Sequence, residues 1–142
     1  MEQKLETNSS EWIVLKVAHK SEKPNTFAVV FPNDMIPRHV ETEPFLKTNA
    51  FLSAEIVSRA KSASAEKEIK IRLTNEGVEK INLISKDTPK IGLGVFVMQK
   101  PFALIHMVSS LNQPVMYWAG EDNAGMVLIT ELIKTYHTLK ET

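Results

Sequence analysis

The sequence contains no cysteine, no excess of either charge and no long apolar run, and each absence excludes a class of protein. Without cysteine among its 142 residues, the chain can have no disulfide framework, thiol nucleophile or cysteine-ligated zinc. Its 17 basic and 17 acidic side chains balance, whereas dedicated nucleic-acid-binding proteins usually carry a basic excess. The apolar runs are far shorter than a membrane span. These absences favour a protein with no membrane segment.

The composition is that of an ordinary globular protein, with 43% apolar and 24% charged residues. We expect a disordered tail over residues 1–10, which are almost all polar, and a single globular domain over residues 11–142. The polar N-terminus has no secretory signal pattern. We therefore expect a cytoplasmic protein.

The first half of the chain predicts two strands, an irregular segment and a helix. Trp12–Ala18 and Thr26–Phe31 are rich in β-formers, and the turn signals between them predict a hairpin. Three prolines interrupt residues 32–48, so we expect an irregular loop there. Apolar residues recur at helical spacing over Asn49–Ala63, which predicts a helix.

The second half alternates between strand and helix patterns. Ile69, Ile71 and Leu73 alternate with charged residues, which predicts a strand with one wet face, at a sheet edge or in a half-exposed sheet. The elements expected in order are a strand Glu68–Thr74, a short helix capped by Thr74 or Asn75, a doubly buried strand Ile91–Met98, a helix from Pro101 to Leu111, a strand Val115–Ala119 and a helix Ala124–Leu139. The glycines within Ile91–Met98 indicate a bulge or a close approach of another group.

This order predicts an α/β or α+β fold built on one mixed sheet of about five strands. An N-terminal hairpin would precede alternating helix and strand units, and the helices would cover the sheet.

The loop of residues 120–125 is the first candidate for a ligand site, because it follows an expected strand and opens an expected helix. A helix N-terminus offers free backbone amides. Gly120 and Gly125 would allow close approach, and Asp122 and Asn123 would supply polar groups. The acidic side chains disfavour phosphate and favour a cation or an amine. A simple helix cap at Asp122 or Asn123 explains the same residues.

None of the four histidines pairs with another at metal-ligand spacing on one helix. His39 lies in the proline-rich loop beside Arg38, which makes it a further candidate for ligand binding, although a solvated charge cluster explains it too. No nucleophile elbow or Walker-type loop is present. We therefore predict no metal site, no cofactor and no catalytic residue, while enzymatic activity stays an open question.

Three functions remain. The first is a small non-catalytic protein-binding or adaptor domain, acting on a partner or by forming a homo-oligomer, with the strand Glu68–Thr74 as a possible pairing edge. The second is a small-ligand-binding or hydrolytic protein that uses residues 120–125. The third is a nucleic-acid-binding protein that uses Lys67, Lys70 and Arg72.

Overall fold

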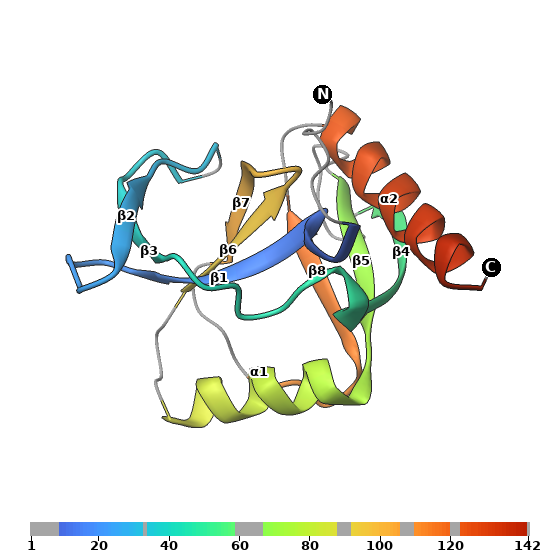
Figure 1. The fold of residues 1–142 in the computed structure, drawn as a ribbon, viewed down its shortest axis with the longest axis horizontal. Coiled ribbons are helices and arrows are strands. Elements are labelled where there is room, and N and C mark those ends of the chain that lie inside the picture. The colour runs from blue at the N-terminus through green and yellow to red at the C-terminus, as the bar shows by residue number, and fades with distance from the viewer. Residues whose placement is uncertain are drawn as a thin grey trace.

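The computed structural model describes residues 9–32, 34–58, 67–87, 92–105, 110–119 and 123–141. In this part of the chain eight strands form two sheets, and two α-helices pack beside them (Figure 1). The elements in order are η1 (Ser9–Glu11), β1 (Ile13–His19), β2 (Thr26–Val29), β3 (Arg38–Glu41), η2 (Thr48–Ala50), β4 (Phe51–Ser58), β5 (Lys67–Leu73), α1 (Asn75–Asp87), β6 (Gly92–Val97), β7 (Lys100–Ile105), β8 (Val115–Ala119) and α2 (Asn123–Glu141), where η marks a short 3₁₀ helix. Of the predicted tail, residues 1–8 lie outside the described residues, and Ser9 and Ser10 belong to η1.

The fold belongs to the α+β class, and the single mixed sheet that the sequence predicted is wrong. One sheet has five strands in the order β2-β3-β1-β6-β7, and the other has three in the order β4-β5-β8. Every strand pairing is antiparallel. The alternation of helix and strand patterns suggested parallel crossovers, but two of the segments that supplied the helical pattern are strands.

One face of each sheet and both helices share a hydrophobic core. In β1 and β6 the residues that face this core alternate with residues on the outer face of the five-stranded sheet, as strand geometry requires. The largest fully buried side chains of the shared core are Ile13, Leu15, Phe51, Ile69, Ile71, Leu73, Ile81, Leu93, Trp118, Ile129 and Ile133. A second, smaller core lies on the outer face, where Val14, Ala18, Phe31, Val40, Phe96 and Leu104 cluster.

Several predicted elements are confirmed. Helix α1 begins where the cap was expected, because the Thr74 hydroxyl accepts a hydrogen bond from the Gly77 amide at 3.1 Å. Strand β6 is buried along its whole length between β1 and β7, as its continuous apolar run indicated. Strands β1 and β8 and helix α2 also lie within a residue or two of their predicted bounds.

The helix predicted over Asn49–Ala63 is wrong, since this segment forms η2 and β4. A register irregularity between Phe51 and Ser53 places an extra residue in β4. Because of it, Phe51, Ala54 and Ile56 pair with the core residues Leu73, Ile71 and Ile69 of β5. The bulge therefore converts one spacing of two into a spacing of three. Leu52 and Val57 are apolar without belonging to the core, and together with the altered spacing they imitate the periodicity of a helix. Residues 59–63 lie outside the described residues.

The helix predicted from Pro101 to Leu111 is also wrong, because residues 100–105 form β7. Strands β6 and β7 form a hairpin through a two-residue turn in which Met98 and Gln99 have φ values of 50° and 71°. Turns of this kind normally contain Asn-Gly or a similar pair, so Met98 and Gln99 carry no recognisable hairpin signal. Pro101 is tolerated because β7 is an edge strand, where a missing backbone N–H costs little.

Two predicted pairings also differ. Strands β1 and β2 do not pair, because β3 lies between them and pairs with both. The wet face of β5 is confirmed, but β5 is the middle strand of its sheet, between β4 and β8. It therefore offers no free edge, and the suggestion that this strand recruits a partner strand is wrong. The strands at the sheet edges are β2, β7, β4 and β8.

Candidate protein-binding surface

The residues of the predicted ligand site do not come together in the part of the chain that is described. Gly120 and Asp122 lie outside the described residues. Asn123 is the exposed first residue of α2, and Gly125 is half-buried in its first turn. His39 belongs to β3, which lies on the opposite side of the molecule from α2 (Figure 1). The structure therefore does not join His39 to the start of α2.

His39 lies instead beside His19, its cross-strand partner on β1. His19 Nε2 is 2.7 Å from a carboxylate oxygen of Glu41, a half-exposed residue of β3. Within the described ranges, no three histidine or acidic side chains are placed to hold a metal ion. His106 lies outside the described residues.

The basic residues of β5 occupy an open sheet face. Lys70 and Arg72 lie on the same side of the three-stranded sheet as Tyr117, which is directly opposite Lys70 on β8. On β4 the residue opposite Lys70 is Glu55, so basic and acidic side chains stand side by side on this face. Lys67 is exposed at the start of the strand.

The most conspicuous exposed apolar surface lies on the loop that joins β2 to β3. Val30, Met35 and Ile36 expose 49%, 73% and 58% of their surface. We call these three residues the apolar tip. The backbone amides of Asp34 and Met35 both donate to the Phe31 carbonyl, at 3.0 and 3.1 Å, so the loop closes tightly on itself.

The loop is anchored to the outer face of the five-stranded sheet through Phe31. This ring is fully buried and meets the ring of Phe96 edge-on, with centroids 5.5 Å apart. It also lies over Gly94, where an added Cβ would be only 2.3 Å from Phe31 Cζ. The close approach that the glycines of this strand predicted is therefore found at Gly94.

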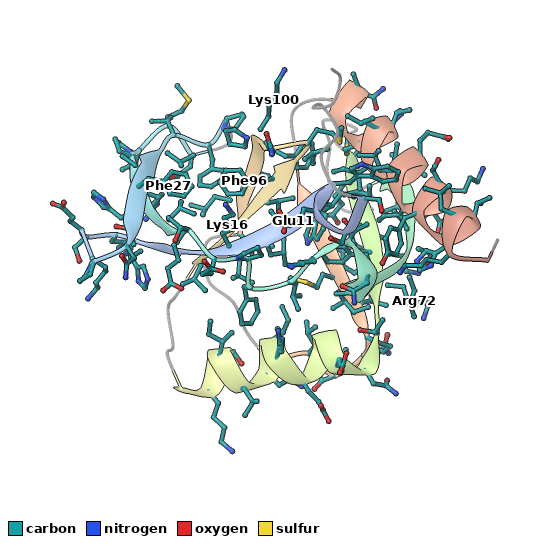
Figure 2. All side chains as sticks on the ribbon, in the orientation of Figure 1. Glu11, Lys16, Phe27, Arg72, Phe96 and Lys100 are labelled. Carbon is teal, nitrogen blue, oxygen red and sulfur yellow. The ribbon has the colours of Figure 1, made fainter. Side chains whose placement is uncertain are left out.

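A lysine completes the same face of the sheet. The Lys16 ammonium lies 5.3 Å from the ring centroid of Phe27 and 5.4 Å from that of Phe96, and Figure 2 shows it beside these two rings. Contacts between a cation and an aromatic face contribute about 0.5–1 kcal/mol each at exposed sites. The outer face is therefore a packed surface to which the loop is fixed.

An ion pair holds the other side of the loop. Arg38 donates to both carboxylate oxygens of Asp34, from Nε at 2.7 Å and from Nη2 at 3.0 Å. The Asp34 side chain is 3% exposed. Hydrogen bonding to Asp34 raises the pKa of Arg38 above the ordinary value for arginine, burial lowers that pKa by less, and the negative charge of Asp34 adds a further increase. Two-point arginine–carboxylate pairs of this kind fix geometry as well as adding energy.

Between these anchors Met35 has a strained backbone. Its φ of 67° lies in the left-handed region, which costs a residue with a Cβ roughly 1–2 kcal/mol. Strained residues that the surrounding structure holds in place are typical of functional sites. The loop therefore holds Met35 in a strained backbone conformation with its side chain largely in solvent, while the side chains of Phe31 and Asp34 are buried.

Sequence reasoning did not select these residues, although a signal was present. The segment was recognised as irregular because of its prolines, and a plain surface loop was the favoured interpretation. The signal was the position of two large apolar residues, Met35 and Ile36, immediately before Pro37. A loop at this place would be expected to contain polar residues instead.

Comparison with known proteins defines the fold. The sequence matches no protein-family model and no curated protein. Among solved structures the chain is similar to SecDF, described as a membrane component that enhances protein export, with a TM-score of 0.61 and 10% identity over 87% of this chain and 61% of that one. It is similar also to SecDF in a super-membrane-facing form, with a TM-score of 0.61 and 12% identity over 89% of this chain and 19% of that one.

At these identities the likeness establishes an α+β fold shared with part of SecDF. This chain spans less than two thirds of the length of either SecDF chain. Among the described residues, no helix is long and apolar enough to cross a membrane.

Proposed function

We propose that this chain is a protein-binding domain and that its apolar tip receives an apolar segment of a non-native polypeptide. The observation that carries the proposal is the exposure of Met35, held in a left-handed conformation between the buried anchors Phe31 and Asp34. Exposed apolar patches on proteins mark interaction sites, and the exposed residues Met35 and Ile36 are adjacent in the chain. Methionine is well suited to varied apolar partners because its side chain is flexible and polarisable.

The shared fold supports the same class of function. SecDF enhances protein export, and export acts on polypeptide chains. A domain of this fold with a rigidly presented apolar tip is suited to hold such a chain by its apolar side chains. Self-association through the apolar tip is the competing form of protein binding.

Replacing Met35 with glycine tests the proposal without damaging the fold. Glycine accepts a φ of 67° freely, so the relief of strain offsets the greater entropy of the unfolded chain, and we expect stability to stay within about 1 kcal/mol of the parent. Burial of a methionine side chain contributes roughly 1.5–3 kcal/mol, so the affinity for a polypeptide should fall at least about tenfold. The measurement is fluorescence anisotropy with labelled lactalbumin that has been reduced and carboxymethylated so that it stays unfolded.

The matched control is Leu83→Ser. Leu83 is 59% exposed on α1, which lies across the molecule from the β2–β3 loop (Figure 1). This change should leave the affinity unchanged. Equal affinities for the parent and Met35→Gly would overturn the proposal. The proposal would also be overturned if the parent protein did not bind the unfolded chain but formed dimers that Met35→Gly abolishes. The partner of the apolar tip would then be a second copy of this chain.

A further inference from the structure

A groove lies between strand β4 and helix α2. β4 is an eight-residue strand at the edge of its sheet, and β5 is its only partner among the described strands. Helix α2 runs beside it, as Figure 1 shows. The space between them has a volume of about 340 Å³, at the lower end of the range of small-molecule sites. Its lining comes from Leu52, Ser53, Ala54, Thr130, Ile133, Lys134, His137 and Thr138.

The chemistry of this groove is apolar and positively charged. Leu52, Ala54 and Ile133 supply the apolar part of the lining. The hydroxyls of Thr130 and Thr138 donate to backbone carbonyls one turn earlier in α2, both at 3.0 Å. Their donors are therefore already satisfied and need no acceptor from a ligand. Lys134 is exposed, and no carboxylate contributes to the lining. A negatively charged ligand therefore has a favourable partner in Lys134 and meets no carboxylate among the lining residues.

His137 closes one end of the strand edge. Its Nε2 lies 2.8 Å from the Phe51 carbonyl, to which it donates a hydrogen bond. The bulge that follows Phe51 separates this capped carbonyl from the rest of β4. From Ser53 onward the outer edge has no described strand partner. An unpaired edge presents backbone donors and acceptors at regular spacing and can accept another strand.

We propose that this groove binds an extended acidic peptide, which adds to β4 as a further strand and places a carboxylate near Lys134. Alternate side chains of such a strand point to the same face, so every second residue would enter the apolar part of the groove. This site shares no residue with the apolar tip. It therefore goes beyond the function proposed above and can be tested separately.

The test uses the ¹⁵N-labelled full chain and three synthetic peptides followed by nuclear magnetic resonance. The first alternates valine with aspartate, the second replaces aspartate with lysine, and the third is the first with alternate backbone nitrogens methylated. We expect the acidic peptide to cause saturable shifts in residues 52–58 and 130–138. The lysine peptide should bind about tenfold more weakly, because one attraction becomes a repulsion. The methylated peptide cannot pair as a strand and should cause no shifts.

Charge reversal on the protein provides the second arm. Lys134→Glu should weaken binding of the acidic peptide about tenfold and strengthen binding of the lysine peptide. Lys86→Glu, an exposed charge change on α1, and Met35→Gly should alter neither. The proposal is overturned if no saturable shifts occur up to millimolar peptide, if they fall only on the β2–β3 loop, or if the lysine or methylated peptide binds as well as the acidic one.

Discussion

Gly94→Ala is expected to destabilise the protein by about 3 kcal/mol, because it forces an atom into space that the Phe31 ring occupies. The new Cβ would lie 2.3 Å from Cζ and 2.9 Å from Cε1 of that ring, well inside van der Waals contact. Phe31 has no free direction in which to move, since it is fully buried against Phe96. The lost stability would be read from urea denaturation of the two proteins.

The same change should weaken the loop as well as the fold. If the Phe31 ring cannot seat on Gly94, the turn built on its carbonyl loses its anchor, and the apolar tip with it. We therefore expect weaker polypeptide binding even at temperatures at which the variant stays folded. Adding Phe31→Leu to Gly94→Ala should cost less than the sum of the two single changes, because the smaller side chain relieves the overlap.

Gly77→Ala is the matched control, since it adds the same methyl group at a glycine with room for it. Its Cβ would be 3.4 Å from the Thr74 hydroxyl oxygen and 3.6 Å from Ala50, which are ordinary contacts. Because Gly77 lies within α1, alanine should leave stability unchanged or raise it by up to about 1 kcal/mol. If Gly94→Ala and Gly77→Ala had similar stabilities, Phe31 would not occupy the position described.

The environment of Gly94 also shows how much of the fold could be predicted from the sequence alone. The glycines predicted a close approach within a buried strand, which is a local property of β6. The residue that approaches, Phe31, is more than sixty positions away and belongs to a segment predicted as the end of a strand. The local pattern indicates that another group lies close to the glycine. Only tertiary packing determines which side chain that is.

Two elements were assigned wrongly because backbone irregularities altered the pattern. The bulge in β4 gave its core-facing residues a spacing typical of a helix. The turn at Met98 and Gln99 joins two strands through left-handed residues that are rarely chosen for it. The bulge appears only in the pairing of β4 with β5, and the turn only in the pairing of β6 with β7, so the residues at each irregularity do not reveal it by themselves. Helices α1 and α2 were predicted correctly because their caps and apolar faces are local.

The candidate surfaces could not be predicted for a related reason. The apolar tip depends on anchors from β6 and β3, and the groove depends on an α2 that packs beside β4. Selection of candidate site residues by residue type favours glycine, acidic residues and histidine, because these residues commonly bind ligands. Exposure of methionine and isoleucine is a property of the folded chain.

Arg38→Met is expected to destabilise the protein by about 3 kcal/mol, because it removes the guanidinium that makes a two-point ion pair with the buried Asp34 carboxylate. Methionine retains an apolar stem at this position, so the loss reports mainly on the charge and its two hydrogen bonds. The pKa of Arg38 is raised above its ordinary value, so in the parent protein the guanidinium is charged at every pH used for such measurements. Its contribution is present below that pKa and would be lost only above it. The measurement is again urea denaturation, at neutral pH.

A double variant separates the charge from the packing. Asp34→Asn in the Arg38→Met background removes the buried negative charge that no longer pairs with Arg38, so the double variant should be more stable than Arg38→Met alone, with a coupling of about 1–3 kcal/mol. High salt should not reproduce the effect of Arg38→Met in the parent, because a pair this well shielded is screened only slightly. If the double variant were the less stable of the two, the pair would not hold the loop by charge. The rigid presentation of Met35 and Ile36 would then have to come from Phe31 alone.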